Sequence, residues 1–487
     1  MQEKQKSKTL QKGVQSRRTA LEVLMRIQTS GAYANLALSA ALKKSQLSDR
    51  DKAFVTLLVH GVTRNLNALD GIIKKYSKKP IDKLPDVLLN TLRLSIFQIE
   101  NLPDTPPSAV LNTAAEIARA CGHKGMASYT TAVLRNYLRD KESGVAPGHG
   151  ASGDGAPDDG EEPSSNQAEA KAMDPAALAL RYSIPEWLVR RWLQNFGQDE
   201  ARTLLQFSTS EPRLIIRVNE QAITTEGLIT ILEGGGVKLR RSPLVPSCLV
   251  LASRGDPSKL PGYSEGLFSI QDDAAALAAI VVAPKPAETV LDLCAAPGGK
   301  ALFLAEMMEN RGRVIAVDKS ASRLELLKRN RNRLGITNVE VVAADGRTFS
   351  QSQLVDRILI DAPCSGTGVL NRKSDLRYKL QEEDIISLSA IQAELLNNAS
   401  TLLKPGGTLV YATCSVEPEE NSLVVDSFLQ SHPDFLLDDL SPFLPKDFIE
   451  EHHLSDSLKS GKLQILPSIG GLSGFFVARM NKTGLIE

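Results

Sequence analysis

The chain has 487 residues, too many for one hydrophobic core, and this length predicts roughly two to four domains. Its composition, 42% hydrophobic and 23% charged residues, is typical of a soluble globular protein, and no apolar stretch approaches the roughly 18 residues that would cross a bilayer. The formal net charge is zero, but residues 1–90 contain 17 Lys and Arg against 7 Asp and Glu, which indicates either contact with a polyanion or an ordinary solvated face.

The first part of the chain is expected to be helical. Residues 1–16 are polar and basic, and we expect a disordered tail there. From residue 17 to residue 140 apolar side chains recur at helical spacing. Helices are expected over residues 67–76, 85–99, 109–120 and 127–138. The stretches "RRTALEVLMRI", "LSDRDKAFVTLLVHGVTRN", "LRLSIFQI" and "VLNTAAEIAR" resemble the NusB-like RNA-binding domain, which implies an RNA-binding bundle; a generic helical accessory domain is the alternative.

Residues 141–172 are rich in Gly, Pro, Ala, Ser and acidic residues, which predicts a flexible acidic linker. Residues 173–260 are expected to form a small α/β, RRM-like RNA-binding module, with strands near 213–219 and 237–241 and a helix over 225–233. The strand arginines, which suit phosphate contact but are also common on outward-facing strands, are Arg213, Arg217, Arg240 and Arg241.

Residues 261–487 read as one Rossmann-like, doubly wound α/β domain, because apolar strands alternate with helical segments. The expected strands are 290–293, 313–317, 339–343, 357–360 and 408–412, with a final pair near 464–466 and 475–478. The expected helices are 301–308, 322–334, 385–403 and 420–429.

A candidate ligand loop, "DLCAAPGGK", follows the first of these strands and ends at Lys300. Its small residues let backbone amides at a helix start approach a ligand. Asp318 lies nineteen residues after Gly299 and ends the second strand, where an acid can bind ribose hydroxyls. Asp345 follows the third strand, where a carboxylate can accept from an adenine amino group. Because the alternating-glycine fingerprint is missing, we expect an adenosyl cofactor that is not a dinucleotide.

Two cysteines follow neighbouring strands. The fourth strand leads into "DAPCSGTG", with Asp361 and Cys364, and the fifth into "YATCSVEPEEN", with Cys414. Cytosine is unreactive at C5 until a nucleophile adds to C6, and a thiolate is a natural nucleophile for that addition. An adjacent acid can hydrogen-bond or protonate N3 as charge develops. The two thiols, the acid and the adenosyl site at one edge of the sheet would therefore together suit methylation of a cytosine at C5.

The five cysteines are odd in number and form no CxxC pair, and none of the six histidines lies at zinc-ligand spacing from them. We therefore expect no disulfide framework, no metal site and reduced thiols in a cytoplasmic protein. Cys121, Cys248 and Cys294 are interpreted as packing residues.

Taken together, "DLCAAPGGK", "DAPCSGTG" and "YATCSVEPEEN" resemble the RNA cytosine-C5 methyltransferases that use S-adenosylmethionine. With the NusB-like front end, the chain is similar to the RsmB/Sun (Fmu) family of bacterial 16S ribosomal RNA enzymes. The resemblance implies a Rossmann-like methyltransferase domain that forms 5-methylcytosine at the 16S rRNA cytosine conventionally numbered 967. It further implies 16S rRNA as partner. We expect no DNA or membrane partner, and a monomer is the default expectation for the oligomeric state.

The resemblance also carries residue roles. It implies that S-adenosylmethionine is contacted by Cys294, Ala295, Ala296, Pro297, Gly298, Gly299, Lys300, Asp318, Asp345 and Asp361. Cys414 corresponds to the nucleophile that bonds cytosine C6, and Cys364 to the cysteine that assists breakdown of the covalent intermediate. Asp361 also engages the target base, and Lys300 positions cofactor or base.

Two departures from the family pattern bear on the target site more than on the chemistry. Arg372-Lys373-Ser374-Asp375 stands where the family often has Arg-His/Asn-Pro-Asp, and Ser473-Gly474-Phe475-Phe476 where Asp-Gly-Phe-Phe is usual. Two alternative functions stay open: a transfer-RNA cytosine-C5 methyltransferase, and a non-catalytic RNA-binding or antitermination factor with a silent methyltransferase fold.

Overall fold

The computed structural model describes residues 2–30, 33–143, 174–252 and 256–484. The chain divides into two compact units: unit 1 comprises residues 1–210 with 370–379, and unit 2 comprises residues 211–369 with 380–487. Most of the predicted linker, from residue 144 onward, lies outside the described residues. In the described part of the chain, no helix combines the length and the apolar character needed to cross a lipid bilayer.

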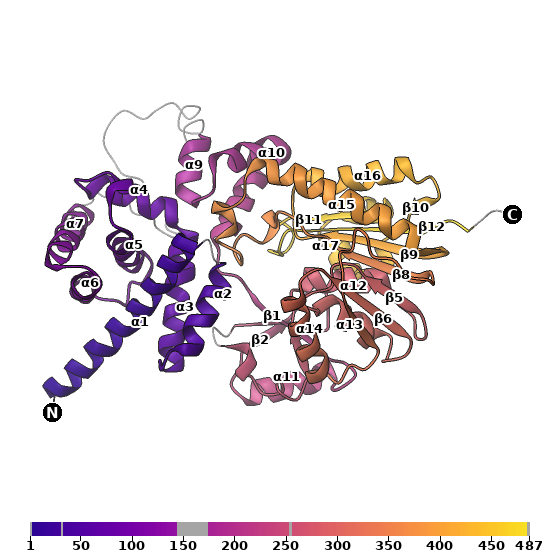
Figure 1. Ribbon diagram of the computed structural model, residues 1–487, viewed down its shortest axis with the longest axis horizontal. Helices are drawn as coiled ribbons and strands as arrows, with labels where there is room; N and C mark the ends of the chain where they lie inside the picture. The colour runs from indigo at the N-terminus through magenta and orange to yellow at the C-terminus, as the bar shows by residue number, and fades with distance from the viewer. Residues whose placement is uncertain (1, 31–32, 144–173, 253–255, 485–487) are drawn as a thin grey trace. The chain divides into compact units, whose positions relative to one another are not determined.

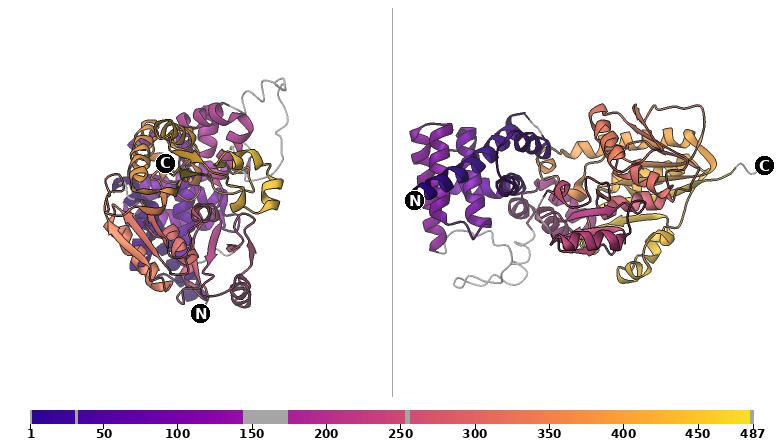
Figure 2. Two further views of the ribbon diagram at one scale, coloured as in Figure 1. Left: turned by 90° about the vertical axis from the view of Figure 1, so that its right-hand side faces the viewer. Right: turned by 90° about the horizontal axis from the view of Figure 1, so that it is seen from below.

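Unit 1 is built from helices in its described residues (Figures 1 and 2). They are α1 (Gln2–Ser30), α2 (Ala34–Lys44), α3 (Asp49–Arg64), α4 (Leu66–Tyr76), η1 (Ile81–Lys83), α5 (Asp86–Asn101), α6 (Pro107–Cys121), α7 (Lys124–Glu142), α9 (Pro175–Tyr182), α10 (Glu186–Thr209) and η4 (Leu376–Tyr378). Helix α5 is the centre of the bundle, because every residue from Leu88 to Gln98 is buried. The predicted helices after residue 66 match α4 to α7 to within three or four residues at each end.

Helix α1 begins at Gln2, whereas the sequence predicts a tail without regular structure up to residue 16. The segment is rich in Lys and Gln, which are good helix formers, and it continues directly into the buried part of the helix. Ser16 and Arg17 are already buried, and Arg17 Nε donates to Gln98 Oε1 at 2.7 Å. The anchored end therefore extends the helix toward the N-terminus.

Unit 2 contains a small four-stranded antiparallel sheet in the order β2-β3-β1-β4. Its elements are β1 (Leu214–Val218), α11 (Thr225–Gly234), β2 (Leu239–Arg241), β3 (Cys248–Leu251), η2 (Pro257–Lys259) and β4 (Phe268–Ile270). The prediction that Arg217 is available to phosphate is wrong: its side chain is 1% exposed, its Nη2 lies 2.9 Å from Glu306 Oε1, and its guanidinium covers the ring of Phe303. Arg240 and Arg241 are exposed, and Arg241 pairs with Glu226.

The large sheet of unit 2 has the order β10-β12-β9-β8-β5-β6-β7, with β11 paired to β12. Its strands are β5 (Thr289–Asp292), β6 (Arg313–Asp318), β7 (Val339–Ala343), β8 (Val355–Asp361), β9 (Leu403–Thr413), β10 (Phe435–Leu437), β11 (Lys462–Ile465) and β12 (Phe475–Lys482). Strands β5 to β9 pair in parallel, and β12 runs antiparallel to β9. The order reverses between β5 and β8, which is where such sheets bind ligands.

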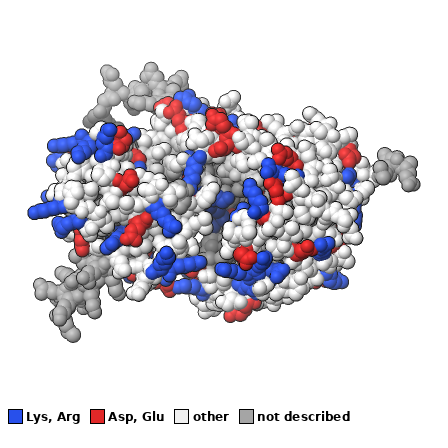
Figure 3. All heavy atoms as spheres, viewed as in Figure 1, with Lys and Arg blue, Asp and Glu red and all other residues white. Residues whose placement is uncertain are grey.

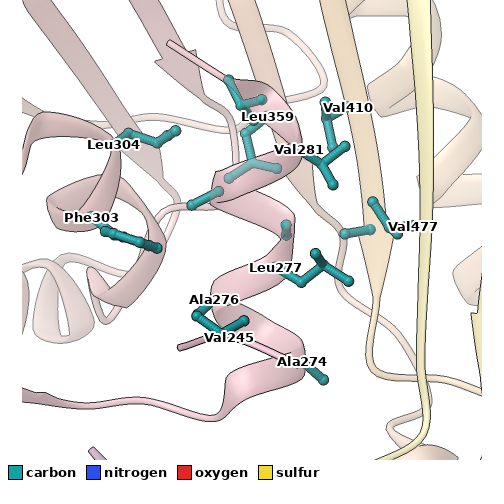
Figure 4. Packing of buried hydrophobic residues seen from close by; sticks show 14 of the residues in the cluster. Val245, Ala274, Ala276, Leu277, Val281, Phe303, Leu304, Leu359, Val410 and Val477 are labelled. Atoms are coloured by element: carbon teal, nitrogen blue, oxygen red, sulfur yellow. The ribbon is translucent and has the colours of Figure 1, made fainter. Parts of the chain in front are cut away.

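Helices cover both faces of this sheet (Figure 1). They are α12 (Asp273–Val282), α13 (Gly299–Met307) and α14 (Ala321–Arg333) on one face, and α15 (Glu382–Leu402) and α16 (Ser422–Ser431) on the other. The short helices η3 (Thr367–Val369), η5 (Pro418–Glu420), η6 (Ser441–Phe443), α17 (Lys446–Glu451) and α18 (Ser455–Lys459) complete the unit. Figure 4 shows Leu277 and Val281 of α12 between α13 and the strand residues Val410 and Val477, with Leu359 next to Val281.

Strand burial follows the alternation expected of a two-faced sheet. Val290 packs with the α12 face and Leu291 with the α15 face, and Val410 and Tyr411 divide in the same way. A helical bundle, a small α/β module and a doubly wound α/β sheet follow one another along the chain, which confirms the predicted fold class.

Candidate active site

Four residues of the candidate site lie at the carboxyl ends of the parallel strands: the predicted Asp318, Asp361 and Cys414, and Asp292, which was not predicted. Asp292 ends β5, Asp318 ends β6 and Asp361 ends β8, while Cys414 follows β9 directly. Since β6, β5, β8 and β9 are consecutive neighbours in the sheet, these side chains come to one edge. Asp345 joins them two residues after β7, the next strand outward.

The candidate cofactor loop, residues 294–300, is fixed by hydrogen bonds to the neighbouring strand. Ala295 N donates to Val317 O at 2.9 Å, and Ala296 N donates to Asp318 Oδ2 at 3.1 Å. Gly298 is the N-cap of α13 and has a φ of 109°, which favours glycine. A Cβ on Gly298 would lie 2.7 Å from Leu327 Cγ. The loop therefore turns tightly and directs the amides at the start of α13 toward the sheet edge.

Asp318 is buried, with 6% of its surface exposed, and both its oxygens accept backbone amides. Oδ2 accepts from Ala296 N, and Oδ1 accepts from Ser320 N at 2.8 Å. Arg323 donates to Ala296 O and lies 3.9 Å from Asp318 Oδ2. A carboxylate has about four acceptor positions, so these contacts leave capacity for ligand hydroxyls.

Lys300 and Asp361 form a close ion pair, with Lys300 Nζ 2.7 Å from Asp361 Oδ2. Burial opposes the charge of Lys300, but the charge and hydrogen bond of Asp361, with the charges of Cys414 and Asp292, raise the pKa of Lys300 above its ordinary value. Lys300 is therefore a fixed cation between the cofactor loop and the cysteine loops. The pair joins the residue after the loop's glycines to the last residue of β8.

Asp292 is a fully buried acid, 0% exposed, that interacts electrostatically with Lys300 and Asp361. Its Oδ1 accepts from Cys294 N at 3.2 Å, while its Oδ2 has no hydrogen-bond partner among the described residues. Burial, reinforced by the charge of Asp361 and opposed by Lys300, raises the pKa of Asp292 to about 8. Burial and the nearby Asp292 also raise the pKa of Cys294, so Cys294 stays a neutral thiol.

Asp345 is held by an arginine that follows it closely. Arg347 Nη2 lies 2.7 Å from Asp345 Oδ2, Arg347 Nε donates to Oδ1 at 3.0 Å, and Arg347 also pairs with Glu394. Hydrogen bonds from Arg347 lower the pKa of Asp345 to about 2. Asp345 is therefore ionised at neutral pH and remains partly exposed at the sheet edge.

The structure brings the two predicted catalytic thiols into contact. Cys364 Sγ and Cys414 Sγ lie 3.3 Å apart, and neither side chain is fully buried. Ala362 N donates to Ala412 O at 2.9 Å and Gly368 N to Cys414 O at 3.1 Å, so the two loops are joined by backbone hydrogen bonds. Fifty residues of sequence separate the cysteines, and parallel pairing of β8 with β9 removes that separation.

Several residues at the site were missed as contributors by reading the sequence. Asp292 and Glu420 stand inside the quoted motifs but read as part of a strand end and a helix start. Arg347 lies only two residues after Asp345, a spacing that could have indicated the pair. Asn421 forms hydrogen bonds to Thr413 and Ser415, on both sides of Cys414. These contacts form only in the folded chain, and the spacing of the residues does not predict them.

Both departures from the family pattern have structural partners. Ser374 belongs to unit 1, is 1% exposed and shares a 2.9 Å hydrogen bond with Thr63 of α3. Ser473 donates to Asp272 Oδ2 at 3.1 Å, and Gly474 N donates to Gly368 O at 2.9 Å. The chain before β12 thus rests directly on the loop that carries Cys364.

Three protein-family models match the chain. Residues 279–481 match the model "16S rRNA methyltransferase RsmB/F", and residues 14–139 match the NusB family. Residues 184–257 match the model for the RsmF/B-like ferredoxin-like domain. The order of matches agrees with a helical bundle, a small α/β module and a catalytic α/β domain.

Curated relatives match over nearly the full chain. The probable ribosomal RNA small subunit methyltransferase B of Bacillus subtilis is 36% identical over 96% of this chain and 98% of that protein. The corresponding Synechocystis protein is 32% identical over 96% of this chain and 100% of its own length. Ribosomal RNA small subunit methyltransferase B of Vibrio cholerae is 31% identical over 96% of this chain and 97% of its length.

Solved structures align with all or with part of this chain. The crystal structure of the protein PH0851 aligns with a TM-score of 0.75 and 28% identity, covering 96% of this chain and 99% of that one. A methyltransferase homologue from Pyrococcus horikoshii aligns with a TM-score of 0.55 and 30% identity, over 63% of this chain and 98% of that one. NSun6 from Pyrococcus horikoshii, solved with SFG, aligns with a TM-score of 0.54 and 25% identity, over 61% and 98%.

Proposed function

The chain belongs to the RsmB/F family of 16S ribosomal RNA methyltransferases, and we propose that it forms 5-methylcytosine in 16S rRNA with S-adenosylmethionine as methyl donor. The observation that carries this proposal is the contact between Cys364 and Cys414, 3.3 Å apart, beside the Lys300–Asp361 ion pair. Nucleophilic addition by one thiol and proton removal by the other need two sulfurs within reach of one base. The cytosine conventionally numbered 967 is the proposed target.

The cofactor loop and the acids around it fit S-adenosylmethionine. Amides at the start of α13 suit the carboxylate of the methionine part, and Gly298, with its positive φ, makes the tight turn that precedes them. Asp318 suits the ribose hydroxyls and Asp345 the adenine amino group. The remaining loop residues that would hold it are Cys294, Ala295, Ala296, Pro297, Gly299 and Lys300, with Asp361. When bound, S-adenosylmethionine supplies an electrophilic methyl group.

We assign the covalent step to Cys414. Its thiolate adds to cytosine C6, which makes C5 nucleophilic enough to take the methyl group. Asp361, held by Lys300, is assigned to N3: as negative charge grows on the ring, N3 takes up a proton from solvent, the Asp361 carboxylate accepts a hydrogen bond from that N3–H, and the proton is released afterwards. Lys300 keeps a positive charge near both Asp361 and Cys414.

We assign product release to Cys364. As a thiolate it takes the proton from C5, the C5–H electron pair restores the C5–C6 double bond, and Cys414 leaves C6 as a thiolate. The net change is one methyl group gained at C5 and one proton released. The target base must be unstacked to expose C6, which favours a single-stranded or loop target.

Variants of the two cysteines test these assignments. The protein is incubated with 16S rRNA lacking the modification and with S-adenosylmethionine, then denatured and examined for a protein–RNA adduct. We expect Cys364→Ser to accumulate the adduct and Cys414→Ser to form none. Adduct with Cys414→Ser and none with Cys364→Ser would reverse the two roles.

Two further experiments test the alternative functions, a tRNA methyltransferase and a non-catalytic RNA-binding factor. Bisulfite mapping of RNA from a deletion strain should lose one cytosine of 16S rRNA; loss at a tRNA position with 16S unchanged would identify a tRNA enzyme. A non-catalytic factor would fail to bind S-adenosylmethionine in calorimetry.

Further proposals concern the whole chain. We propose a cytoplasmic monomer that acts on 16S rRNA without a DNA or membrane partner. We also propose its division into a basic N-terminal segment (1–16), in which helix α1 begins, an RNA-binding bundle (17–140), a linker (141–172), a small RNA-binding module (173–260) and the catalytic domain (261–487).

A further inference from the structure

A network of buried polar side chains lies directly behind the two cysteine loops. Its members, all less than 5% exposed, are Ser365, Thr367, Gln392, Thr413, Ser415, Glu420 and Asn421. Burying this many polar groups is unfavourable unless each is hydrogen-bonded in a defined geometry, so such a network fixes the position of the backbone that it contacts.

Glu420 holds the residues on one side of Cys364. Its Oε1 accepts from Ser365 N at 2.8 Å, and its Oε2 accepts from Ser365 Oγ at 2.5 Å. Gln392 Nε2 donates both to Glu420 Oε1 at 3.1 Å and to Pro363 O at 2.9 Å. The peptide groups before and after Cys364 are therefore both tied to Glu420, directly or through Gln392.

Asn421, the next residue, holds both sides of Cys414. Its Oδ1 accepts from Thr413 Oγ1 at 2.6 Å, and its Nδ2 donates to Ser415 O at 3.0 Å and to Gln464 Oε1 at 2.7 Å. Ser415 N in turn donates to Thr413 Oγ1 at 3.2 Å. The backbone on both sides of the second cysteine is thus fixed by one side chain.

Two contacts join the hydrogen bonds around Cys364 to those around Cys414. Tyr411, on β9, donates its hydroxyl to Glu420 O at 2.6 Å, which fixes the backbone of the pair. Ser365 Oγ and Ser415 Oγ lie 3.1 Å apart, so the residues that directly follow the two cysteines contact each other. These side-chain contacts add to the backbone hydrogen bonds that already join the two loops, whose sulfur atoms lie 3.3 Å apart.

We propose that Glu420 and Asn421 form a two-residue clamp in which Glu420 positions Cys364 and Asn421 positions Cys414. They are positioning residues, since neither faces the reacting atoms. The expected kinetic effects rest on the proposed function: Asn421 should control formation of the covalent adduct, and Glu420 should control its resolution. The geometric part, which residue supports which thiol, holds whatever the RNA substrate is.

Shape-matched substitutions give opposite expectations at the two positions. In Glu420→Gln the Oε1 atom still accepts from Ser365 N and Gln392, and the new amide donates to Ser365 Oγ, so function should be kept. In Asn421→Asp the donor to Ser415 O and Gln464 Oε1 is lost and carboxylate oxygen faces carbonyl oxygen, so support of Cys414 should fail. Glu420→Ala removes both hydrogen bonds to Ser365 and leaves Gln392 with its contact to Pro363 O alone.

Alkylation measures the geometric part without RNA. The full chain is treated with iodoacetamide, and each cysteine is followed by mass spectrometry, with Cys121 in unit 1 as internal reference. Glu420→Ala should change the rate of Cys364 at least about 3-fold and leave Cys414 within about 2-fold; Asn421→Asp should do the reverse, because thiol reactivity follows the local environment. Equal changes at both cysteines in both variants would overturn the clamp.

Single-turnover methylation then tests the consequences. We expect Asn421→Asp to slow adduct formation, and Glu420→Ala to slow adduct resolution, each by about 10- to 100-fold, since misplacement by 1 Å can cost this much. Glu420→Gln should stay within a few-fold of wild type. Glu288→Ala, which breaks a pair with Arg357 at the other end of the sheet, is the matched control that loses stability but keeps both rates. If wild type and Cys364→Ser show no adduct and no methylation, the proposed function fails while the alkylation result still decides the clamp.

Discussion

The buried carboxyl group of Asp292 should make the stability of unit 2 depend on pH in a direction opposite to that of most acids. Its pKa is raised from 3.8 to about 8, first by burial and then by the charge of Asp361. A folded-state pKa above the unfolded value means that the folded chain keeps a proton that the unfolded chain releases. The contribution of Asp292 to the free energy of unfolding is therefore fully present below about pH 4 and is lost as the pH rises toward 8.

The magnitude follows from the proton that folding retains. Between about pH 5 and pH 7 the unfolded group is ionised and the folded group is protonated, so the free energy of unfolding changes by about 1.4 kcal/mol per pH unit. Asp292→Asn removes the titration while keeping an oxygen for Cys294 N. Over these two pH units the stability of the wild type should fall by about 3 kcal/mol relative to that of the variant.

Unit 2 must be followed separately from unit 1, since a chain of several domains does not unfold in one step. Urea titrations at pH 5, 6 and 7, read by pulsed hydrogen exchange of peptides from β5 and β8, measure the transition of unit 2 alone. Asp447→Asn, at an exposed position of the same unit, removes an equal charge and should run parallel to wild type. A constant difference between Asp292→Asn and wild type across the pH range would show that Asp292 is ionised in the folded chain and refute the reasoning.

Three further substitutions have definite expectations. Arg377→Met should destabilise unit 1 by about 3–5 kcal/mol in urea titrations followed by tryptophan fluorescence, because the guanidinium is fully buried and donates to five backbone carbonyls that would lose their partner. Gly61→Ala should cost the same unit about 1–3 kcal/mol by the same measurement, since the new methyl group overlaps the ring of Phe97. Gly368→Ala should speed hydrogen exchange at the start of β12, because its Cβ overlaps the backbone of Gly474, and unchanged exchange there would show that the two segments can separate without loss.

Much of the fold could be predicted because the signals are local. The parallel strands of unit 2 are short runs rich in β-branched residues, and all but the edge strand β7 are largely buried. Four of the five predicted ranges lie inside β6 to β9, and the fifth, 290–293, overlaps β5 and runs one residue past its end. Strands β3 and β4 and helix α12 were missed. Cys248–Leu251 is a four-residue apolar run, too short to show alternation, and α12 is apolar on all sides because it is enclosed by the sheet, α13 and the small module.

The division into units was harder to see because it depends on contacts distant in sequence. Residues 370–379 follow the "DAPCSGTG" loop in the chain but belong to unit 1, where Arg377 donates to Ser208 O at 2.6 Å and Tyr378 accepts from Leu66 N at 3.2 Å. More than 160 residues separate each of these pairs. A hydrogen-bond partner so remote leaves no periodicity or composition that a single sequence could show.

The candidate site shows the same limit at the level of single side chains. Motif spacing placed Asp361, Cys364 and Cys414 at strand ends and Lys300 at the end of the loop after the first strand, and the sheet order explains why these segments meet. The motif could not show that Glu420 faces the loop of Cys364, because a glutamate at a helix start is ordinarily solvent-exposed and favoured there by the helix dipole. Burial, visible only in the folded chain, is what separates a support for the site from a capping residue.

Burial also decides which arginines remain available for RNA. Arg93, Arg217, Arg357, Arg377 and Arg479 are all buried, and four of them are neutralised by Asp or Glu while Arg377 binds carbonyl oxygens. The exposed cations of unit 1 include Lys43 and Lys44 at the end of α2 and Lys74, Lys75, Lys78 and Lys79 at and after the end of α4. On the face shown in Figure 3, Lys and Arg lie among acidic side chains. Because each phosphate contact contributes to the salt dependence of binding, the exposed lysines and not these five buried arginines should contribute to it.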